Sequence, residues 1–260
     1  MILIFEQTFS AGFMHKVYLR FYEELNDFLP KEKRKIRFEH NYIDRTSVKD
    51  LIESFGVPHT EIDLILVNGK SVNFRYLIND GDDISVYPVF ESLDISGVQH
   101  LRPKPLRSPK FIADVHLGRL TRYLRMTGFD VLYKNNFSDE EIIRISLNEK
   151  RAILTRDRGI LKRNEVTHGY WVRSTKVKEQ LKEVIKRFDL KSEIKEFTRC
   201  IECNTKLKKT SKSKIINELP PKVAAWHNGF FICPSCRKVY WKGSHYQKML
   251  RLIENVKNDF

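Results

Sequence analysis

The sequence predicts a protein of several domains: a small α+β module, an α/β module with a parallel sheet, and a four-cysteine module. Three observations predict this division. The chain has 260 residues, more than one typical domain. Strand-like and helix-like segments alternate through its central part, which is typical of an α/β fold. Its four cysteines all fall in two C-x₂-C pairs in the last third of the chain.

The first module mixes strands with one helix. Residues 16–22 alternate apolar and polar side chains, as a half-buried strand does, and residues 35–40 form a shorter strand after a charged surface connection. Residues 46–58 place apolar side chains at helical spacing behind a hydroxyl cap. Asn68-Gly69, between two apolar runs, then predicts a tight hairpin. Together these elements indicate a small α+β roll.

This order of elements ends in the pattern L-x-x-D-G-D-x-I-x-V-x-P. Over residues 14–92 it resembles the ubiquitin-like β-grasp proteins, particularly the small sulfur carriers. Sulfur carriers and conjugated modifiers end in a free Gly-Gly tail, whereas this chain continues through a basic, proline-rich stretch that predicts a linker at 96–109. The resemblance therefore implies a β-grasp module that binds a protein partner or positions its neighbours. A stabilising appendage is the alternative.

The central segment alternates strands and helices, which predicts a parallel sheet with crossover helices. The expected strands are residues 110–114, 130–135, 151–157 and 170–174, and the expected helices are 117–127, 138–150 and 176–188. Ligands of such sheets collect beyond the carboxyl ends of the strands.

Acidic residues fall at this edge of the predicted sheet. Asp114 and Asp157 end two expected strands, and Asp139 opens the helix between them, followed by Glu140 as a weaker fourth candidate. Clustered carboxylates repel one another unless a cation joins them, and hard oxygen ligands suit Mg²⁺ or Mn²⁺. The pattern favours a divalent metal site, although each acid alone also suits a cap or a helix first turn.

Arginines accompany these acids. Three follow Asp114 on one side of a predicted helix, and two flank Asp157. Such residues usually form a solvated face, but beside an acidic cluster they fit contacts with nucleic-acid phosphates. The five expected RNA-contacting arginines are Arg119, Arg122, Arg125, Arg156 and Arg158.

The cysteines have the spacing of a structural zinc site. Two C-x₂-C pairs separated by 29 residues supply four thiolates for tetrahedral Zn²⁺, which is favoured here over redox-active thiols. The expected ligands are Cys200, Cys203, Cys233 and Cys236. The Lys-, Ser- and Thr-rich insert between the pairs predicts a basic loop.

Aromatic residues interleave with lysines after the second cysteine pair. Tyr240 and Trp241 suit either stacking on unpaired bases or packing within the small zinc module. His245 lies in an expected loop after Gly243, where there is little core to pack against. We expect Trp241 and His245 to contact RNA.

Charge is distributed unevenly along the chain. Residues 1–100 have 11 basic and 16 acidic residues, whereas residues 101–260 have 36 basic and 17 acidic residues. An anionic partner is therefore expected to bind the second part. No apolar run approaches the roughly 18 residues of a membrane span, and the opening residues make a poor signal peptide, so we expect a cytoplasmic protein without a membrane partner.

Residues 110–250 resemble the Mut-seven C-terminal RNase family, a PIN-like domain fused to a zinc ribbon. The resemblance rests on three long segments, FIADVHLGRLTRYLRMTGFDVLY, SDEEIIRISLNEKRAILTRDRGILKR and FFICPSCRKVYWKGSHYQKM. It implies metal-dependent ribonuclease chemistry with acids at Asp114, Asp139 and Asp157, and a fourth for which Glu140 is the candidate. The expected domains are a ubiquitin-like β-grasp domain at 1–95, a linker at 96–109, a PIN-like nuclease at 110–195 and a zinc ribbon at 196–260.

The function predicted from these features is hydrolysis of RNA with a structural Zn²⁺ and a catalytic Mg²⁺ or Mn²⁺. A non-catalytic RNA- or ribosome-binding protein of the same fold is the alternative. A protein modifier or sulfur carrier is opposed by the continuation of the chain beyond the β-grasp module.

Overall fold

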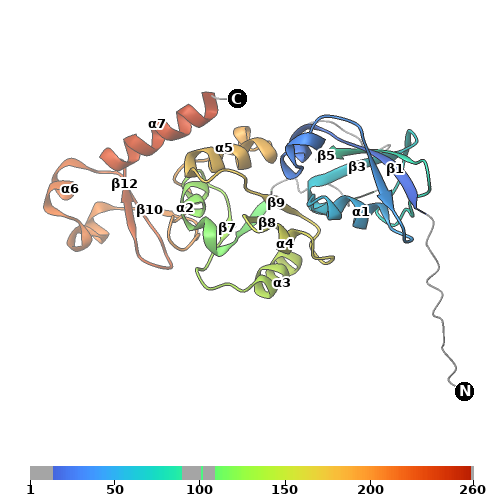
Figure 1. The fold of residues 1–260 in the computed structure, drawn as a ribbon. Helices are drawn as coiled ribbons and strands as arrows, with labels where there is room; N and C mark the ends of the chain where they lie inside the picture. Colours follow the sequence, from blue (N-terminus) through green and yellow to red (C-terminus); the bar gives the residue numbers. More distant parts are fainter. Residues whose placement is uncertain (1–13, 90–100, 102–108, 259–260) are drawn as a thin grey trace, which may run out of the picture. The chain divides into compact units, whose positions relative to one another are not determined.

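The computed structural model describes residues 14–89, 101 and 109–258 and divides the chain into two compact units, 1–104 and 105–260 (Figure 1). The predicted linker at 96–109 lies outside the described residues except at Leu101 and Pro109, and the predicted domain bounds stay predictions. Across the described segments, no helix combines the length and apolarity that crossing a membrane requires.

The first unit is a mixed five-stranded sheet with the order β2-β1-β5-β3-β4. Strands β1 and β5 run parallel, and the other pairs are antiparallel. The elements are β1 (His15–Phe21), β2 (Phe38–Tyr42), α1 (Val48–Ser54), β3 (Ile62–Val67), β4 (Lys70–Ser71) and β5 (Asp83–Pro88). This is the predicted β-grasp arrangement.

Local chemistry explains these elements. The Ser47 hydroxyl caps α1 by accepting from the Asp50 amide at 3.1 Å. Asn68 and Gly69 both have positive φ, as a two-residue hairpin between β3 and β4 requires. The expected surface connection before β2 is wrong in part, because residues 23–33 form two short 3-10 helices and bury Leu25 and Phe28.

The second unit contains a four-stranded parallel sheet with the order β7-β6-β8-β9. Its strands are β6 (Lys110–Ala113), β7 (Val131–Leu132), β8 (Arg151–Thr155) and β9 (Gly169–Trp171). Its helices are α2 (Gly118–Met126), α3 (Asp139–Glu149), α4 (Arg158–Leu161) and α5 (Val177–Arg187). The predicted parallel α/β fold is confirmed.

Alternate strand residues build a core on each face of this sheet. Phe111 and Leu154 pack in one cluster with α2 and α5, whereas Ile112 and Ile153 pack in another with α3 and α4. Figure 1 shows these helix pairs on opposite sides of the strands. Both faces are covered, and the central residues of β6 and β8 are accordingly apolar.

The four-cysteine module adds a three-stranded antiparallel sheet with the order β10-β11-β12. Its elements are β10 (Lys208–Thr210), α6 (Pro221–Trp226), β11 (Phe230–Ile232), β12 (Val239–Trp241) and α7 (Ser244–Asn258). The insert between the cysteine pairs is therefore not simply a loop, since it contributes β10 and a buried Ile215. Helix α7 returns to the parallel sheet, where Ile253 and Val256 join the cluster of α2 and α5.

Asp130, between α2 and β7, joins the parallel sheet to the cysteine module. Its carboxylate pairs with Arg151 at 2.6 Å and with Arg199 at 3.1 Å. It also accepts a hydrogen bond from the side-chain Nδ2 of Asn204 at 2.8 Å. Burial raises the pKa of Asp130, but the hydrogen bonds from Arg151 and Asn204 outweigh this effect and hold its pKa below the ordinary value.

We expect Asp130→Asn to lower the free energy of unfolding by about 2 kcal/mol, because the buried Arg151 loses its closest counter-ion. A lowered folded pKa means that this stabilisation is present above the unfolded pKa of about 4 and is lost as the pH falls further. Denaturant unfolding of the zinc-loaded wild-type and variant proteins at pH 7 measures it, since strong acid also releases zinc from its thiolates. Glu254→Gln, an exposed acid on α7, is the control. Equal stability of Asp130→Asn and wild type at pH 7 would contradict the assignment.

Candidate functional site

The two acids predicted at strand ends lie on neighbouring strands. Asp114 directly follows β6, and Asp157 lies two residues beyond β8. Ala113 pairs with Leu154 in the parallel ladder, so Asp114 stands beside Thr155 at the carboxyl edge of the sheet. Asp114 is buried, at 7% exposed, whereas Asp157 is exposed.

One hydroxyl connects these two acids. Thr155 Oγ1 donates to Asp114 Oδ2 at 2.7 Å and accepts from the Asp157 amide at 2.8 Å. Thr155 is fully buried, so its geometry is restricted by packing. Sequence reasoning did not single out Thr155, although a threonine two residues before an acid at a strand end is a typical turn-forming pattern.

Both acids also cap the segments that follow them. Asp114 Oδ1 accepts from the His116 amide at 3.1 Å, and Asp157 Oδ1 accepts from the Gly159 amide at 2.7 Å. The structural alternative considered from sequence is thus present at both positions. It does not exclude ligand binding, because a carboxylate offers about four lone-pair sites.

Asp139 is brought close to the same acids. It is the first residue of α3, where a complete capping box between Ser138 and Glu141 begins the helix. Burial raises the pKa of Asp139, and the nearby negative charges of Asp157, Asp114 and Glu140 raise it further. The four predicted acids therefore share one electrostatic environment. Their mutual repulsion is what a bound divalent cation would relieve.

The carboxylates are less compactly grouped than the thiols. Among the residues that the structure describes, the ligand group tight enough to hold a metal ion is that of the four cysteines. The acids nevertheless offer oxygen donors of the type that Mg²⁺ and Mn²⁺ prefer, converging at one edge of the sheet. The residues present therefore fit a hard divalent cation in their chemistry.

The five predicted arginines have different environments. Arg119 is exposed on α2, and Arg158 is exposed with its guanidinium 5.0 Å from the centre of the Trp171 ring. Arg122 is 58% exposed but pairs with Glu202 at 2.7 Å. Arg119 and Arg158 are thus both exposed to solvent, and the guanidinium of Arg122 is exposed but paired with Glu202.

Two of the predicted phosphate contacts are opposed by the structure. Arg125 is only 4% exposed and donates to the carbonyl oxygens of Val131, Ile201 and Glu202. Arg156 is half-buried, and its Nη1 donates to carbonyl oxygens in residues 172–174. Both guanidiniums satisfy backbone groups, so we remove Arg125 and Arg156 from the expected RNA surface.

The aromatic residues after the second cysteine pair are partly structural. Tyr240 places its hydroxyl 3.1 Å from Cys200 Sγ and accepts from the Ile201 amide at 3.2 Å. Trp241 is half-buried against the cluster of Ile215, Leu219 and Phe230. His245 lies in the first turn of α7 rather than in a loop, and its side chain falls outside the described part.

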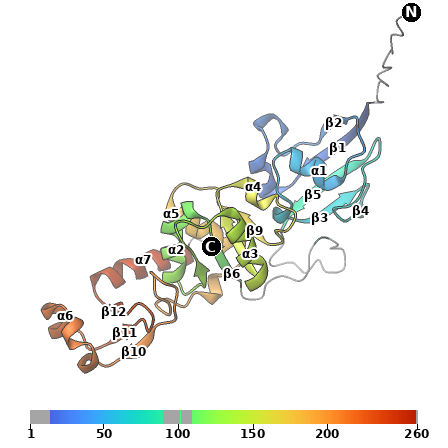
Figure 2. The ribbon, with the colours of Figure 1, turned by 90° about the horizontal axis from the view of Figure 1, so that it is seen from below.

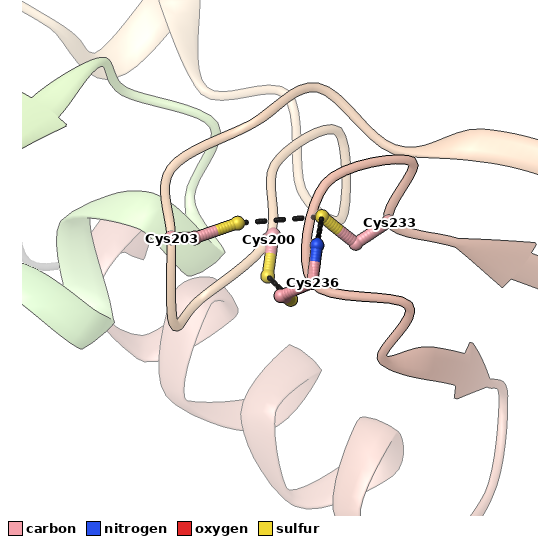
Figure 3. A group of neighbouring side chains, drawn as sticks. All are labelled: Cys200, Cys203, Cys233 and Cys236. Carbon is pink, nitrogen blue, oxygen red and sulfur yellow. Dashed lines mark hydrogen bonds between the residues drawn. The ribbon is translucent and has the colours of Figure 1, made fainter.

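The four cysteine sulfurs point toward one another from two loops (Figure 3). All four Sγ atoms lie within 4.8 Å of one another, with 3.5 Å between Cys200 and Cys236 and 3.3 Å between Cys203 and Cys233. This donor set and clustering fit a closed tetrahedral zinc site.

The two loops are near copies of each other. The residue after each second cysteine, Asn204 or Arg237, has positive φ and donates its amide to the carbonyl of the first cysteine of its pair. The amide of each first cysteine in turn donates to the carbonyl of Thr205 or Lys238. Each C-x₂-C pair is therefore held in the same tight turn, which aims both sulfurs inward.

The first cysteine loop is docked on the parallel-sheet core. Asn204 Oδ1 accepts from the Val131 amide of β7 at 3.1 Å, while Arg125 donates to the loop carbonyls at 201 and 202. Glu202 bridges Arg122 and Lys238, and the hydrogen bonds from these two residues lower its pKa to about 2. The first cysteine loop and the parallel sheet are consequently joined by one hydrogen-bonded network.

We expect one Zn²⁺ per chain in the purified protein, and its loss on Cys233→Ser, because a closed four-thiolate site derives much of its folding energy from the metal. Elemental analysis measures the zinc, and Ser235→Ala in the same loop is the control because it removes no ligand.

Zinc removal should also increase hydrogen exchange at the Val131 amide, whose acceptor is in the first cysteine loop. Native-state exchange with and without a chelator measures this. Protein that lacks zinc as purified, or unchanged protection of Val131 after chelation, would contradict the account.

Two family models match the chain. The model described as the Mut7-C RNAse domain matches residues 109–253, more than half of the chain, and the model described as Mut7-C ubiquitin matches residues 14–94. The resemblance stated from sequence is confirmed by these matches. No curated protein and no solved structure matches the chain.

Proposed function

Because the chain belongs to the Mut7-C RNAse domain family, we propose that it is a ribonuclease that hydrolyses RNA phosphodiester bonds with the help of Mg²⁺ or Mn²⁺. The observation that carries this proposal is the pairing of Asp114 and Asp157 through one buried hydroxyl at the carboxyl edge of a parallel sheet, with Asp139 close enough to raise the local negative potential.

Each acid has a place in this proposal. Asp114, Asp139 and Asp157 would hold the divalent cation, with Glu140 as the fourth acid at the same edge. A cation held there would supply activation of the attacking water and offset the charge of the scissile phosphate. Water adds its oxygen to phosphorus, the bond to the leaving oxygen breaks, and that oxygen receives a proton.

The other residues of the chain orient this reaction. Thr155 keeps Asp114 and Asp157 at a constant separation, which is a positioning role. Arg119 and Arg158, which are both exposed, are assigned to contacts with the RNA phosphates. The zinc ribbon supports the sheet and adds basic surface, since residues 191–260 contain 15 basic and 6 acidic residues. The β-grasp unit is acidic overall and is assigned to a protein partner rather than to RNA.

We expect Asp114→Asn to reduce RNA cleavage by at least about 100-fold while zinc content and RNA affinity persist. Asparagine keeps the shape and the cap but removes the charge that binds a hard cation. A labelled-RNA cleavage assay with added Mn²⁺ measures the rate, and Glu254→Gln on α7 is the matched control.

If Asp114 only caps the segment after β6, asparagine replaces it almost equally well. Cleavage by Asp114→Asn at the wild-type rate would therefore reject the proposed metal ligand. Absence of divalent-dependent cleavage in the wild-type protein would instead favour a non-catalytic RNA-binding role.

Thr155→Val should lower RNA cleavage by about 10- to 100-fold and raise the Mn²⁺ concentration needed for the half-maximal rate. Mutation of a residue that hydrogen-bonds to a metal ligand typically has an effect of this size. Valine has a similar volume but cannot orient both acids. Thr155→Ser restores the hydroxyl and should recover most of the activity. Equal Mn²⁺ dependence of the valine and wild-type proteins would show that the hydroxyl has no positioning role.

A further inference from the structure

The cysteine module carries a groove that the proposed cleavage chemistry does not use. It has a volume of about 640 Å³ and is formed by α6, β12, the start of α7 and the first cysteine loop. Figures 1 and 2 both show α6 beside β12. This volume lies within the ordinary range of about 300–1,000 Å³ for ligand pockets.

Aromatic rings dominate this groove. Five aromatic side chains line it, and they are Phe197, Trp226, Tyr240, Trp241 and Tyr246. Trp226 is 82% exposed although it is the last residue of α6. Trp241 and Tyr246 are partly or largely buried, so they form a wall anchored in the module. A large ring kept in water beside an apolar wall marks a binding surface rather than a core.

The rim of the groove is cationic. Lys222 and Lys238 line it together with His227, and Lys238 also pairs with Glu202 at 2.7 Å. Lys242 lies near the groove, since its ammonium group is 5.5 Å from the centre of the ring of Tyr246, a lining residue. Apolar rings surrounded by ammonium groups complement a flat base attached to phosphates. An apolar peptide would match the rings but would offer no negative charge to the ammonium groups of Lys222 and Lys242, and a second copy of the same face would bring further lysines.

We propose that this groove binds unpaired bases of single-stranded RNA, stacked on the exposed ring of Trp226, with Lys222 facing the adjoining phosphates. This inference rests on the proposed ribonuclease function and narrows its substrate to RNA with an unpaired segment. Bases within a duplex are stacked on one another and do not present their faces to a groove, so duplex RNA gains only phosphate contacts.

Fluorescence anisotropy of the full-length, zinc-loaded protein tests the proposal with three probes: an oligouridylate, an abasic oligomer of the same length and charge, and an RNA duplex. Binding is measured without added Mg²⁺ or Mn²⁺, so cleavage does not interfere. Trp226→Ala should weaken oligouridylate binding by roughly 10-fold and leave abasic and duplex binding unchanged. Trp226→Phe, which keeps an aromatic face, should retain most of the affinity.

Matched variants separate stacking from charge and from folding. Ile216→Ala, at another exposed apolar residue of the same module, should bind all three probes as wild type does. Lys222→Gln should weaken binding of the oligouridylate and the abasic oligomer equally, because both present phosphates. Zinc content and melting temperature should be unchanged in every variant.

Several results would overturn the inference. Wild-type affinity of Trp226→Ala for oligouridylate would do so, as would an equal loss for the abasic oligomer. A change in oligomeric state of Trp226→Ala, with RNA binding intact, would assign the groove to a second copy of the chain. Failure of the proposed ribonuclease function is scored separately, by the absence of divalent-dependent RNA cleavage by the wild-type protein.

Discussion

The first cysteine loop rests on the corner between α2 and β7, and this contact connects the two halves of the second unit. Arg125 crosses the contact from the sheet side, and Asn204 crosses it from the metal side. The guanidinium of Arg125 is buried, and the free-energy cost of burying this charge is offset while the loop carbonyls accept its hydrogen bonds. The loop itself carries Cys200 and Cys203, two of the four thiols whose clustering fits a zinc ion. Zinc bound there would thereby support the helix that follows Asp114.

This contact engages part of the basic face of α2. A helix with three arginines beside an acidic edge suggests a surface for phosphates, but two of the three are used within the protein. Arg125 fixes the cysteine loop, and Arg122 pairs with Glu202 in the same loop. Of the predicted arginines, Arg119 and Arg158 remain exposed. In the proposed function, RNA contacts are distributed between the acidic edge of the sheet and the aromatic groove of the cysteine module.

Sequence reasoning succeeded where the local pattern determines the structure. The Asn68-Gly69 hairpin, the capping box at Ser138 and the paired cysteines each depend on a few neighbouring residues. It was less successful where the partner is distant in sequence. Polar residues in an amphipathic helix are assigned to solvent by periodicity alone. Arg125 was misplaced because two of its three acceptors, the carbonyls of Ile201 and Glu202, lie 76 and 77 residues further along the chain. Strand β10 has a charged sequence and exists because it pairs with β11, and the groove at Trp226 exists only when α6 packs beside β12.

The central claim is that acids at the carboxyl edge of the parallel sheet bind a divalent cation that cleavage requires. The most direct measurement follows Mn²⁺ binding by electron paramagnetic resonance and RNA cleavage in the same zinc-loaded samples, over a range of Mn²⁺ concentrations. The account predicts that cleavage rises in proportion to bound Mn²⁺ and is absent when Mn²⁺ and Mg²⁺ are removed with the zinc retained. Full cleavage by protein that holds zinc but no other divalent cation would contradict it.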